Sequence, residues 1–394
     1  MRMVHRTLTV AAVLLGSLLS TPALAQEYAA TAPDSTARAG VESVVSGDSF
    51  TDTDSQHGIA TFDIAAAWRP SRRITIEGRP VITRDYDGAW HADLYQLAVR
   101  YDRPGDVRWR LEAGYLLSPV GILPLESRAD QNPMIVPTAA YTSYLPTFEA
   151  GTPSVQLASG LYPLGAQATA STTHWDVRAG VLGSSPARVR PLTGDRPPGA
   201  PQISFGGGVT PFTGLRVGSS FVFGRYAKAS EVADPSTGDR TATIVGVDAD
   251  YAFGYTRVYV DWMHNAYERA GGTTIGTALT ATAVRTLLPR LYVAGRVQRQ
   301  TTSSTIEQRL VTYGYPVDPL RSTGTYAAYR PSGAAVLEWV EAGPADSLSV
   351  EAVAAYRIST DVTAKGGYLG YRFFGVSSLD NRVEVQIVWT RRWW

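Results

Sequence analysis

Apolar and polar residues alternate along most of this chain, in segments of about ten residues. In the last segment, Val383, Val385 and Ile387 fall on one side of an extended chain, whereas Arg382 and Glu384 fall on the other. A period of two predicts a β-strand with one apolar and one polar face, because successive side chains of a strand point to opposite faces. Similar segments cover residues 59–68, 73–83, 91–101, 107–117, 175–181, 215–223, 243–253, 258–262, 291–298 and 350–357. The helical period is not sustained in any segment, so the sequence predicts an all-β chain.

The connections between these segments alternate between short and long. The short ones lie at 69–71, 102–105, 211–214, 254–255, 288–289 and 359–360, and the long ones at roughly 84–90, 118–152, 184–200, 227–240, 268–274 and 301–346. Membrane barrels have short turns at one end and long loops at the other, and strands of about ten residues cross a bilayer when tilted. We therefore expect a transmembrane antiparallel β-barrel whose apolar faces contact lipid. The alternative is a soluble exported β-sandwich, in which those faces pack together.

The strand count follows from placing every second turn at the end where the chain terminates. This places a further turn at 163–172, and it requires residues 38–48 to form the first strand although their alternation is weak. The total is sixteen strands. One more hairpin, from residues 305–313 and 330–341, would raise it to eighteen.

The first 25 residues have the form of a secretory signal peptide. Arg2 and Arg6 precede an apolar stretch from Leu8 to Leu19, and Ala23-Leu24-Ala25 is a cleavage site of the A-x-A type. The predicted organisation is therefore a signal peptide (1–25), a flexible lead-in (26–37) and a barrel (38–394). Cleavage lowers the number of basic residues from 36 to 34 against 35 acidic ones, a net charge of −1. That balance disfavours a nucleic-acid partner.

The residue types needed for catalysis or metal binding are sparse and scattered. The chain has no cysteine, and His57, His91, His174 and His264 are too far apart in sequence for a metal-binding motif. The serines lack the GxSxG pattern of a hydrolase nucleophile. We expect no metal, no cofactor and no enzymatic activity, with a barrel hydrolase as the enzymatic alternative.

Residues 118–152 form a long proline-containing connection after the fifth strand, which makes it the third outer loop. A loop of this length without strand pattern is usually functional or disordered, and its apolar content disfavours disorder. We expect it to fold into the barrel and pack on the inner wall; a lid across the barrel end is the alternative. In the inward arrangement, Glu126, Arg128 and Asp130 reach a constriction.

Arginines on the polar strand faces are expected to line an aqueous interior, because an arginine facing lipid near mid-membrane costs about 2–4 kcal/mol. Those on neighbouring strands near the third loop either form a basic ladder opposite its acids or pair within the wall with Glu77 and Glu112. The predicted pore-lining residues are Arg73, Arg79, Arg108, Arg110 and Glu112, together with the three loop residues.

The last predicted strand also carries Trp389 and ends on Trp393 and Trp394. The signal peptide, the rhythm of strands and turns, the third loop and this aromatic C-terminal strand together resemble the sixteen-stranded porins of Gram-negative outer membranes. The run from Gly114 to Gly121 is faintly similar to the phosphate-selective-porin-like families, although the lysine clusters of those families are absent here. The resemblance implies an outer-membrane location, contacts with membrane lipid and lipopolysaccharide, and insertion by the barrel-insertion machinery through the C-terminal strand. A homotrimer is implied by analogy.

These features predict a porin, a water-filled channel for passive diffusion of small hydrophilic solutes or ions. The alternative is a non-channel outer-membrane barrel that anchors or adheres through its long outer loops.

Overall fold

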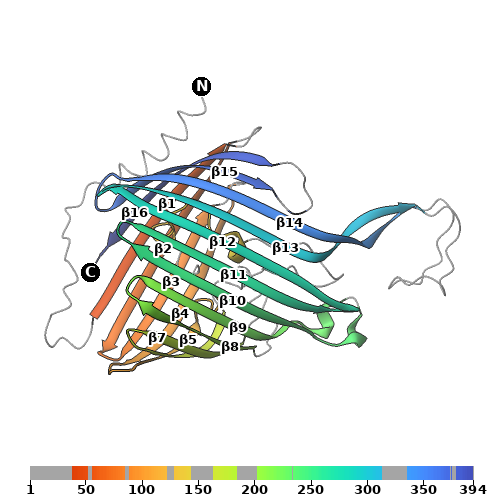
Figure 1. The fold of residues 1–394 in the computed structure, drawn as a ribbon, viewed down its shortest axis with the longest axis horizontal. Helices are drawn as coiled ribbons and strands as arrows, with labels where there is room; N and C mark the ends of the chain where they lie inside the picture. Colours follow the sequence, from red (N-terminus) through yellow and green to blue (C-terminus); the bar gives the residue numbers. More distant parts are fainter. Residues whose placement is uncertain are drawn as a thin grey trace.

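The computed structural model describes residues 38–51, 56–84, 88–121, 128–142, 163–183, 202–232, 234–312, 335–372, 374 and 379–393. In this part of the chain, sixteen antiparallel strands join in sequence order into one closed barrel, and β16 pairs with β1. Figure 1 shows the strands running obliquely around the barrel. The predicted all-β barrel and its sixteen strands are confirmed. Among the described residues, the helices are too short to cross a membrane.

The strands are β1 (Arg38–Thr51), β2 (Gln56–Ser71), β3 (Ile74–Arg84), β4 (Trp90–Arg103), β5 (Arg108–Tyr115), β6 (Leu164–Ser171), β7 (Trp175–Leu182), β8 (Gln202–Phe212), β9 (Leu215–Ala227), β10 (Arg240–Phe253), β11 (Thr256–Arg269), β12 (Gly272–Leu288), β13 (Leu291–Thr312), β14 (Ala335–Arg357), β15 (Val362–Arg372) and β16 (Asp380–Arg392). Three helical turns complete the described elements: α2 (Ala139–Thr142), η2 (Ala229–Glu231) and η3 (Pro235–Thr237).

One end of the barrel carries only short turns, and we call it the short-turn end. The β8–β9 and β10–β11 turns there contain Gly214 at φ 94° and Gly254 at φ 54°. A positive φ is open to glycine at little steric cost, so these residues allow the strands to reverse within two residues. The long connection after β5 lies at the opposite end.

Two predicted connections are wrong. The predicted turn at 163–172 is strand β6, and the chain turns at residues 172–174 instead. This strand, LGAQATAS, consists mostly of small residues and therefore has little contrast between its faces. The predicted long loop at 268–274 is a tight turn between Arg269 and Gly272, with Gly271 at φ 95°.

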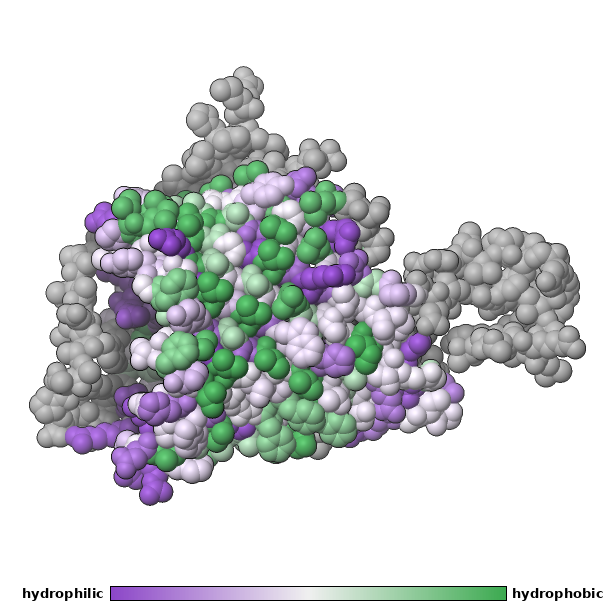
Figure 2. All heavy atoms as spheres, in the orientation of Figure 1, coloured by the Kyte–Doolittle hydropathy of each residue, from purple (hydrophilic) through white to green (hydrophobic). Residues whose placement is uncertain are grey.

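The outer face of the barrel is apolar along the strands. Trp68 and Val383 expose 51% and 59% of their surface in the isolated chain. Figure 2 shows such residues scattered over the strand face, with hydrophilic residues gathered toward its margins. The apolar faces thus point outward rather than packing against one another as a sandwich requires, and a lipid environment covers a surface of this kind.

The segments that left the strand count open form one long hairpin. Residues 305–312 continue β13 and residues 335–341 begin β14, so they lengthen existing strands and add none. This hairpin extends beyond the neighbouring strands in Figure 1. The predicted signal peptide and lead-in lie outside the described residues.

The barrel is sealed where the two ends of the described chain meet. Ten register pairs join β1 to β16, from Glu42 opposite Arg392 to Thr51 opposite Val383. Beyond the last pair, the Trp393 amide donates to the carbonyl oxygen of Val41 at 2.8 Å. The Trp393 indole N–H donates to the Ser43 hydroxyl, also at 2.8 Å. The C-terminal strand therefore closes the barrel through both backbone and side chain.

Candidate functional site

The third loop is held on the inner wall by a lysine. Lys365 projects from β15, is buried, and directs its ammonium group at the backbone of the loop. Its Nζ donates to the carbonyl oxygens of Ala129, Asn132 and Met134 at 2.7, 2.7 and 3.0 Å. Because an ammonium group has three donors, this contact uses the full hydrogen-bonding capacity of the side chain.

A carboxylate and a guanidinium on the adjacent strands bind the next loop residues. Glu351 of β14 accepts from the backbone amides of Ile135 and Val136 at 2.9 and 3.1 Å through one oxygen. Arg296 of β13 donates to the Val136 carbonyl at 2.9 Å and to the Asn132 side-chain oxygen at 2.8 Å. Opposite charges on three neighbouring strands thus satisfy both the amides and the carbonyls of one loop turn. The described loop residues follow the inward path expected from the sequence.

A second attachment lies across β9 and β11. The Tyr141 hydroxyl, in α2, lies 3.0 Å from the Val120 carbonyl and 3.1 Å from the Asp261 carboxylate. The Gly121 amide lies 3.4 Å from the Ser220 hydroxyl. Burial, and then the charge of Asp261, raises the pKa of Tyr141 well above its ordinary value, so this phenol stays a donor. An apolar cluster surrounds the attachment: Val120, Ala140, Tyr141, Val222, Tyr226, Ala227, Ala242, Ile244, Tyr259, Met263, Tyr267 and Ala278.

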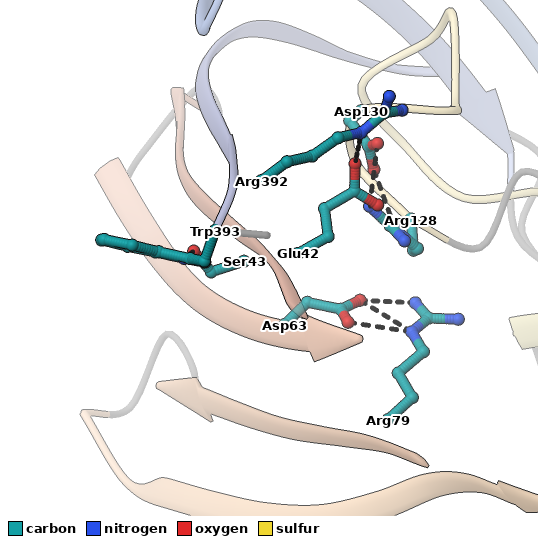
Figure 3. A network of polar contacts seen from close by, with 8 residues as sticks. All are labelled: Glu42, Ser43, Asp63, Arg79, Arg128, Asp130, Arg392 and Trp393. Carbon is teal, nitrogen blue, oxygen red and sulfur yellow. Dashed lines mark hydrogen bonds and ion pairs between the residues drawn. The ribbon is translucent and has the colours of Figure 1, made fainter. Parts of the chain in front are cut away.

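The loop also reaches the seam of the barrel, as Figure 3 shows. Arg128 donates to Glu42 of β1 at 2.6 Å and to Asp130 of its own loop at 3.0 Å, while Arg392 of β16 donates to the other oxygen of Glu42 at 3.0 Å. Burial lowers the pKa of Arg128, but the charge of Asp130 and the bond to Glu42 outweigh it and raise that pKa overall. Glu42 therefore joins both sealing strands to the third loop.

Ion pairs also cross the wall of β2 and β3. Arg79 and Asp63 are both buried, and the guanidinium engages both carboxylate oxygens, with distances of 2.5 to 2.9 Å (Figure 3). The same guanidinium lies 5.6 Å from the centre of the Tyr95 ring. Strict alternation over residues 91–101 predicts that Tyr95 lies on the outer face with Leu97. This prediction is wrong, because a register shift opposite Arg79 and Pro80 leaves Tyr95 beside the inner ion pair.

On β3 to β5 the pairing continues toward the short-turn end. Arg100 lies between two carboxylates, 2.6 Å from Glu77 and 3.1 Å from Glu112. Arg110 donates to Asp102 at 2.9 Å. These contacts follow the within-wall pairing rather than the ladder facing the loop.

One arginine binds two acids on the wall of β7 to β10. Arg216 donates to Asp176 at 3.1 Å and to Asp248 at 2.7 Å, which are on different strands. Between them, the guanidinium passes over Gly208 and Gly218. A methyl group added to Gly208 would lie 2.6 Å from Nη2, and one added to Gly218 would lie 2.7 Å from Nη1. Glycine is therefore required at both positions for this contact.

The predicted pore-lining residues fall into separate groups. Arg128 and Asp130 bind each other in the loop, Arg79 and Glu112 lie within the paired wall, and Glu126 lies outside the described residues. The remaining three, which are exposed at or near the short-turn end, are Arg73, Arg108 and Arg110. The structure thus does not bring the predicted basic ladder opposite Asp130.

The residues that attach the loop were not recognised from the sequence. Lys365, Glu351 and Arg296 contact loop atoms far from them in the chain, and Tyr141 of the loop contacts Asp261 of β11 in the same way. No local pattern marks such contacts. One signal was available: Lys365 is one of only two lysines in an arginine-rich chain.

Comparison with solved structures relates this architecture to known proteins. An outer membrane protein of Vibrio cholerae, OmpT with loop L8 deleted, superposes with a TM-score of 0.54 at 8% identity over 91% of this chain and 100% of its own. An anion-selective porin from Comamonas acidovorans superposes with a TM-score of 0.54 at 8% identity, over 90% of this chain and 100% of its own. Salmonella typhi OmpF, in complex with daunomycin, superposes with a TM-score of 0.52 at 11% identity, over 90% of this chain and 97% of its own.

The fold is that of the sixteen-stranded outer-membrane porins. No protein-family model matches the sequence, and no curated protein matches it. At these identities, the likeness to the porins is one of fold alone.

Proposed function

We propose that this porin-like barrel is a channel for the passive diffusion of small hydrophilic solutes or ions across the outer membrane. The observation that carries the proposal is the opposite chemistry of the two barrel faces. The outer face is apolar, whereas the inner face carries charged side chains such as Arg100 and Arg216. A sixteen-stranded barrel has room for an aqueous channel, which eight strands fill with side chains.

The position of the third loop supports a passage along one side of the barrel. The described loop residues contact the inner face of β13 to β15 and, through Gly121 and Tyr141, that of β9 and β11. On the other side, Arg100, Glu112 and Arg216 keep 17–28% of their side-chain surface accessible. We therefore assign the solute path to the wall of β3 to β8 and to the part of β9 around Arg216. The outer-membrane location agrees with the fold, and insertion through β16 and assembly as a homotrimer belong to the same proposal.

The test is single-channel recording with purified, folded protein in planar bilayers. We expect stepwise conductance in KCl and, in liposomes, swelling with small neutral sugars. Empty membranes and heat-denatured protein are the controls. Protein that inserts, as shown by protease protection of its strands, but passes neither ions nor sugars would contradict a channel and favour the non-channel barrel that acts through its outer loops.

A further inference from the structure

The apolar outer face of the barrel extends as far as the short turns. Phe212 ends β8, Leu288 ends β12 and Ile358 follows β14, and each of these side chains is more than half exposed. Lipid that covers them brings its headgroups to the level of the turns, because the apolar band of a membrane barrel ends where the headgroups begin. Charged side chains that leave the outer face at this level therefore lie beside lipid phosphates.

Two arginines near the ends of β3 and β4 reach the outer face at this level. Arg103 is the last residue of β4 and lies opposite Trp109 of β5, whose side chain is exposed on the outside. Arg73 lies in the turn before β3, and its Nη1 donates to the Tyr101 hydroxyl at 3.4 Å. Tyr101 lies two residues before Arg103 and therefore on the same face of β4. The contact with Tyr101 thus holds the Arg73 guanidinium on the side where Arg103 lies.

The backbone places these two arginines next to each other. The amide of Asp102 donates to the Arg73 carbonyl at 2.7 Å, so Arg73 lies beside the residue that precedes Arg103. Both arginines are exposed, and neither forms an ion pair with a described residue. The Asp102 carboxylate accepts from Arg110 at 2.9 Å, and Asp106 is an exposed acid in the following turn. Two arginines against one exposed acid leave a net positive charge here.

We propose that Arg73, Arg103, Tyr101 and Trp109 form a binding site for an anionic phospholipid in the leaflet at the short-turn end, and we call it the phospholipid site. The two guanidinium groups offer forked donors that match the oxygens of the headgroup phosphate. Their long apolar stems lie along the barrel while the charged ends reach the phosphate. Trp109 packs against the adjoining part of the lipid, as amphipathic rings do at a membrane boundary.

The charges around the site favour an anionic headgroup over a zwitterionic one. A zwitterionic headgroup carries a cationic group beside its phosphate, and this group is repelled by Arg73 and Arg103. The nearest acid along β4, Asp102, is already bound to Arg110. A headgroup with a net negative charge avoids this repulsion, and each arginine near the surface raises the affinity for it about fivefold. The inference goes beyond the channel function, because it requires a barrel embedded in lipid and does not depend on conduction.

The test measures by native mass spectrometry which phospholipids stay bound to the purified, folded protein. The protein in detergent receives equal amounts of phosphatidylglycerol and phosphatidylcholine with the same acyl chains. We expect the native protein to retain more phosphatidylglycerol, and the double variant Arg73→Gln/Arg103→Gln to lose this preference about fivefold or more. An excess of inorganic phosphate at constant ionic strength should leave the lipid bound, because its acyl chains also contact the barrel. Displacement by phosphate would overturn a lipid site in favour of a site for the free ion.

The matched control is Arg69→Gln/Arg108→Gln, which removes the same charge from the same end of the barrel. These two arginines face the interior, because their neighbours Trp68 and Trp109 are exposed on the outer face. We expect the control to prefer phosphatidylglycerol as the native protein does. Equal retention of the two lipids by the native protein, or an equal loss of preference in the control, overturns the phospholipid site. Neither result bears on the channel, which is tested separately by its conductance.

Discussion

The ammonium nitrogen of Lys365 lies 2.7 Å from the carbonyl oxygen of Asn132, although the two residues are 233 positions apart. The contact joins β15 to the third loop, and two more loop carbonyls complete the surroundings of the same nitrogen. Lysine fits this position because its compact charge can direct three donors to three separate acceptors. The side chain thus fixes the path of a loop turn rather than a single atom.

Replacement of Lys365 by methionine should release this turn. The change removes the donors and leaves three buried carbonyls without them, so we expect the free energy of unfolding to fall by about 3 kcal/mol. It should also make the segment around residues 129–134 accessible to protease. Urea unfolding in detergent and mass-mapped proteolysis measure the two effects.

The matched control is Lys228→Met, which alters the other lysine, located between β9 and η2. It should leave the loop protected and stability nearly unchanged. Equal losses in the free energy of unfolding for the two substitutions would show that the hydrogen bonds from Lys365 to the loop do not stabilise the protein.

Replacement of Gly218 by alanine should disturb the ion pair of Arg216 and Asp248. The added methyl would lie 2.6 Å from an Asp248 oxygen and 2.7 Å from the guanidinium. We expect a loss of about 1–3 kcal/mol in the free energy of unfolding, typical of a methyl forced into filled space. Gly366→Ala, where no atom lies within 4 Å of the added methyl, should be tolerated. If both variants unfold at the same urea concentration, Arg216 and Asp248 do not pack against Gly218 as closely as the structure shows.

Replacement of Tyr141 by phenylalanine should weaken the attachment of the loop to β11. It removes the single O–H that lies within hydrogen-bond distance of the Val120 carbonyl and the Asp261 carboxylate, and we expect a loss of about 1–3 kcal/mol in the free energy of unfolding. Hydrogen exchange should quicken at residues 139–142. Tyr255→Phe, at a turn residue that is 79% exposed, should change neither quantity. Unchanged exchange in the Tyr141 variant would argue against this attachment.

The Trp393–Ser43 hydrogen bond at the barrel seam can be isolated by a double-mutant cycle. Trp393→Phe keeps an aromatic ring but removes the N–H, and Ser43→Ala removes the acceptor. We expect the two substitutions to be non-additive by about 1 kcal/mol in the free energy of unfolding. Strictly additive effects would mean that the bond does not stabilise the closed barrel.

The strand faces and the strand number could be predicted from the sequence because both depend on local alternation. In β16, apolar residues alternate with charged ones, and every second residue faces outward as expected. Alternation does not mark β6, because small residues on both faces of this strand remove the contrast. Nor does it give the face of Tyr95, because an extra residue in β4 changes the face of its neighbours without changing the sequence pattern.

The contacts of the interior could not be predicted in the same way. Whether Arg79 binds Asp63 or a loop acid depends on register and on side-chain reach across the wall. Glu351 meets the Ile135 amide across 216 residues of sequence. Such partners are set by the closure of the barrel, so the residues that hold the loop became visible only in three dimensions.

The anchors of the third loop bind mainly its main chain. Lys365 contacts three carbonyls, Glu351 contacts two amides, and Arg296 contacts one carbonyl in addition to two side chains. Every amino acid except proline offers these same backbone groups. Side chains at positions such as Ala129 and Val136 can therefore be exchanged while the location of the loop is preserved. Substitutions in the loop can therefore change the side chains that face passing molecules while the backbone contacts that fix the loop stay the same.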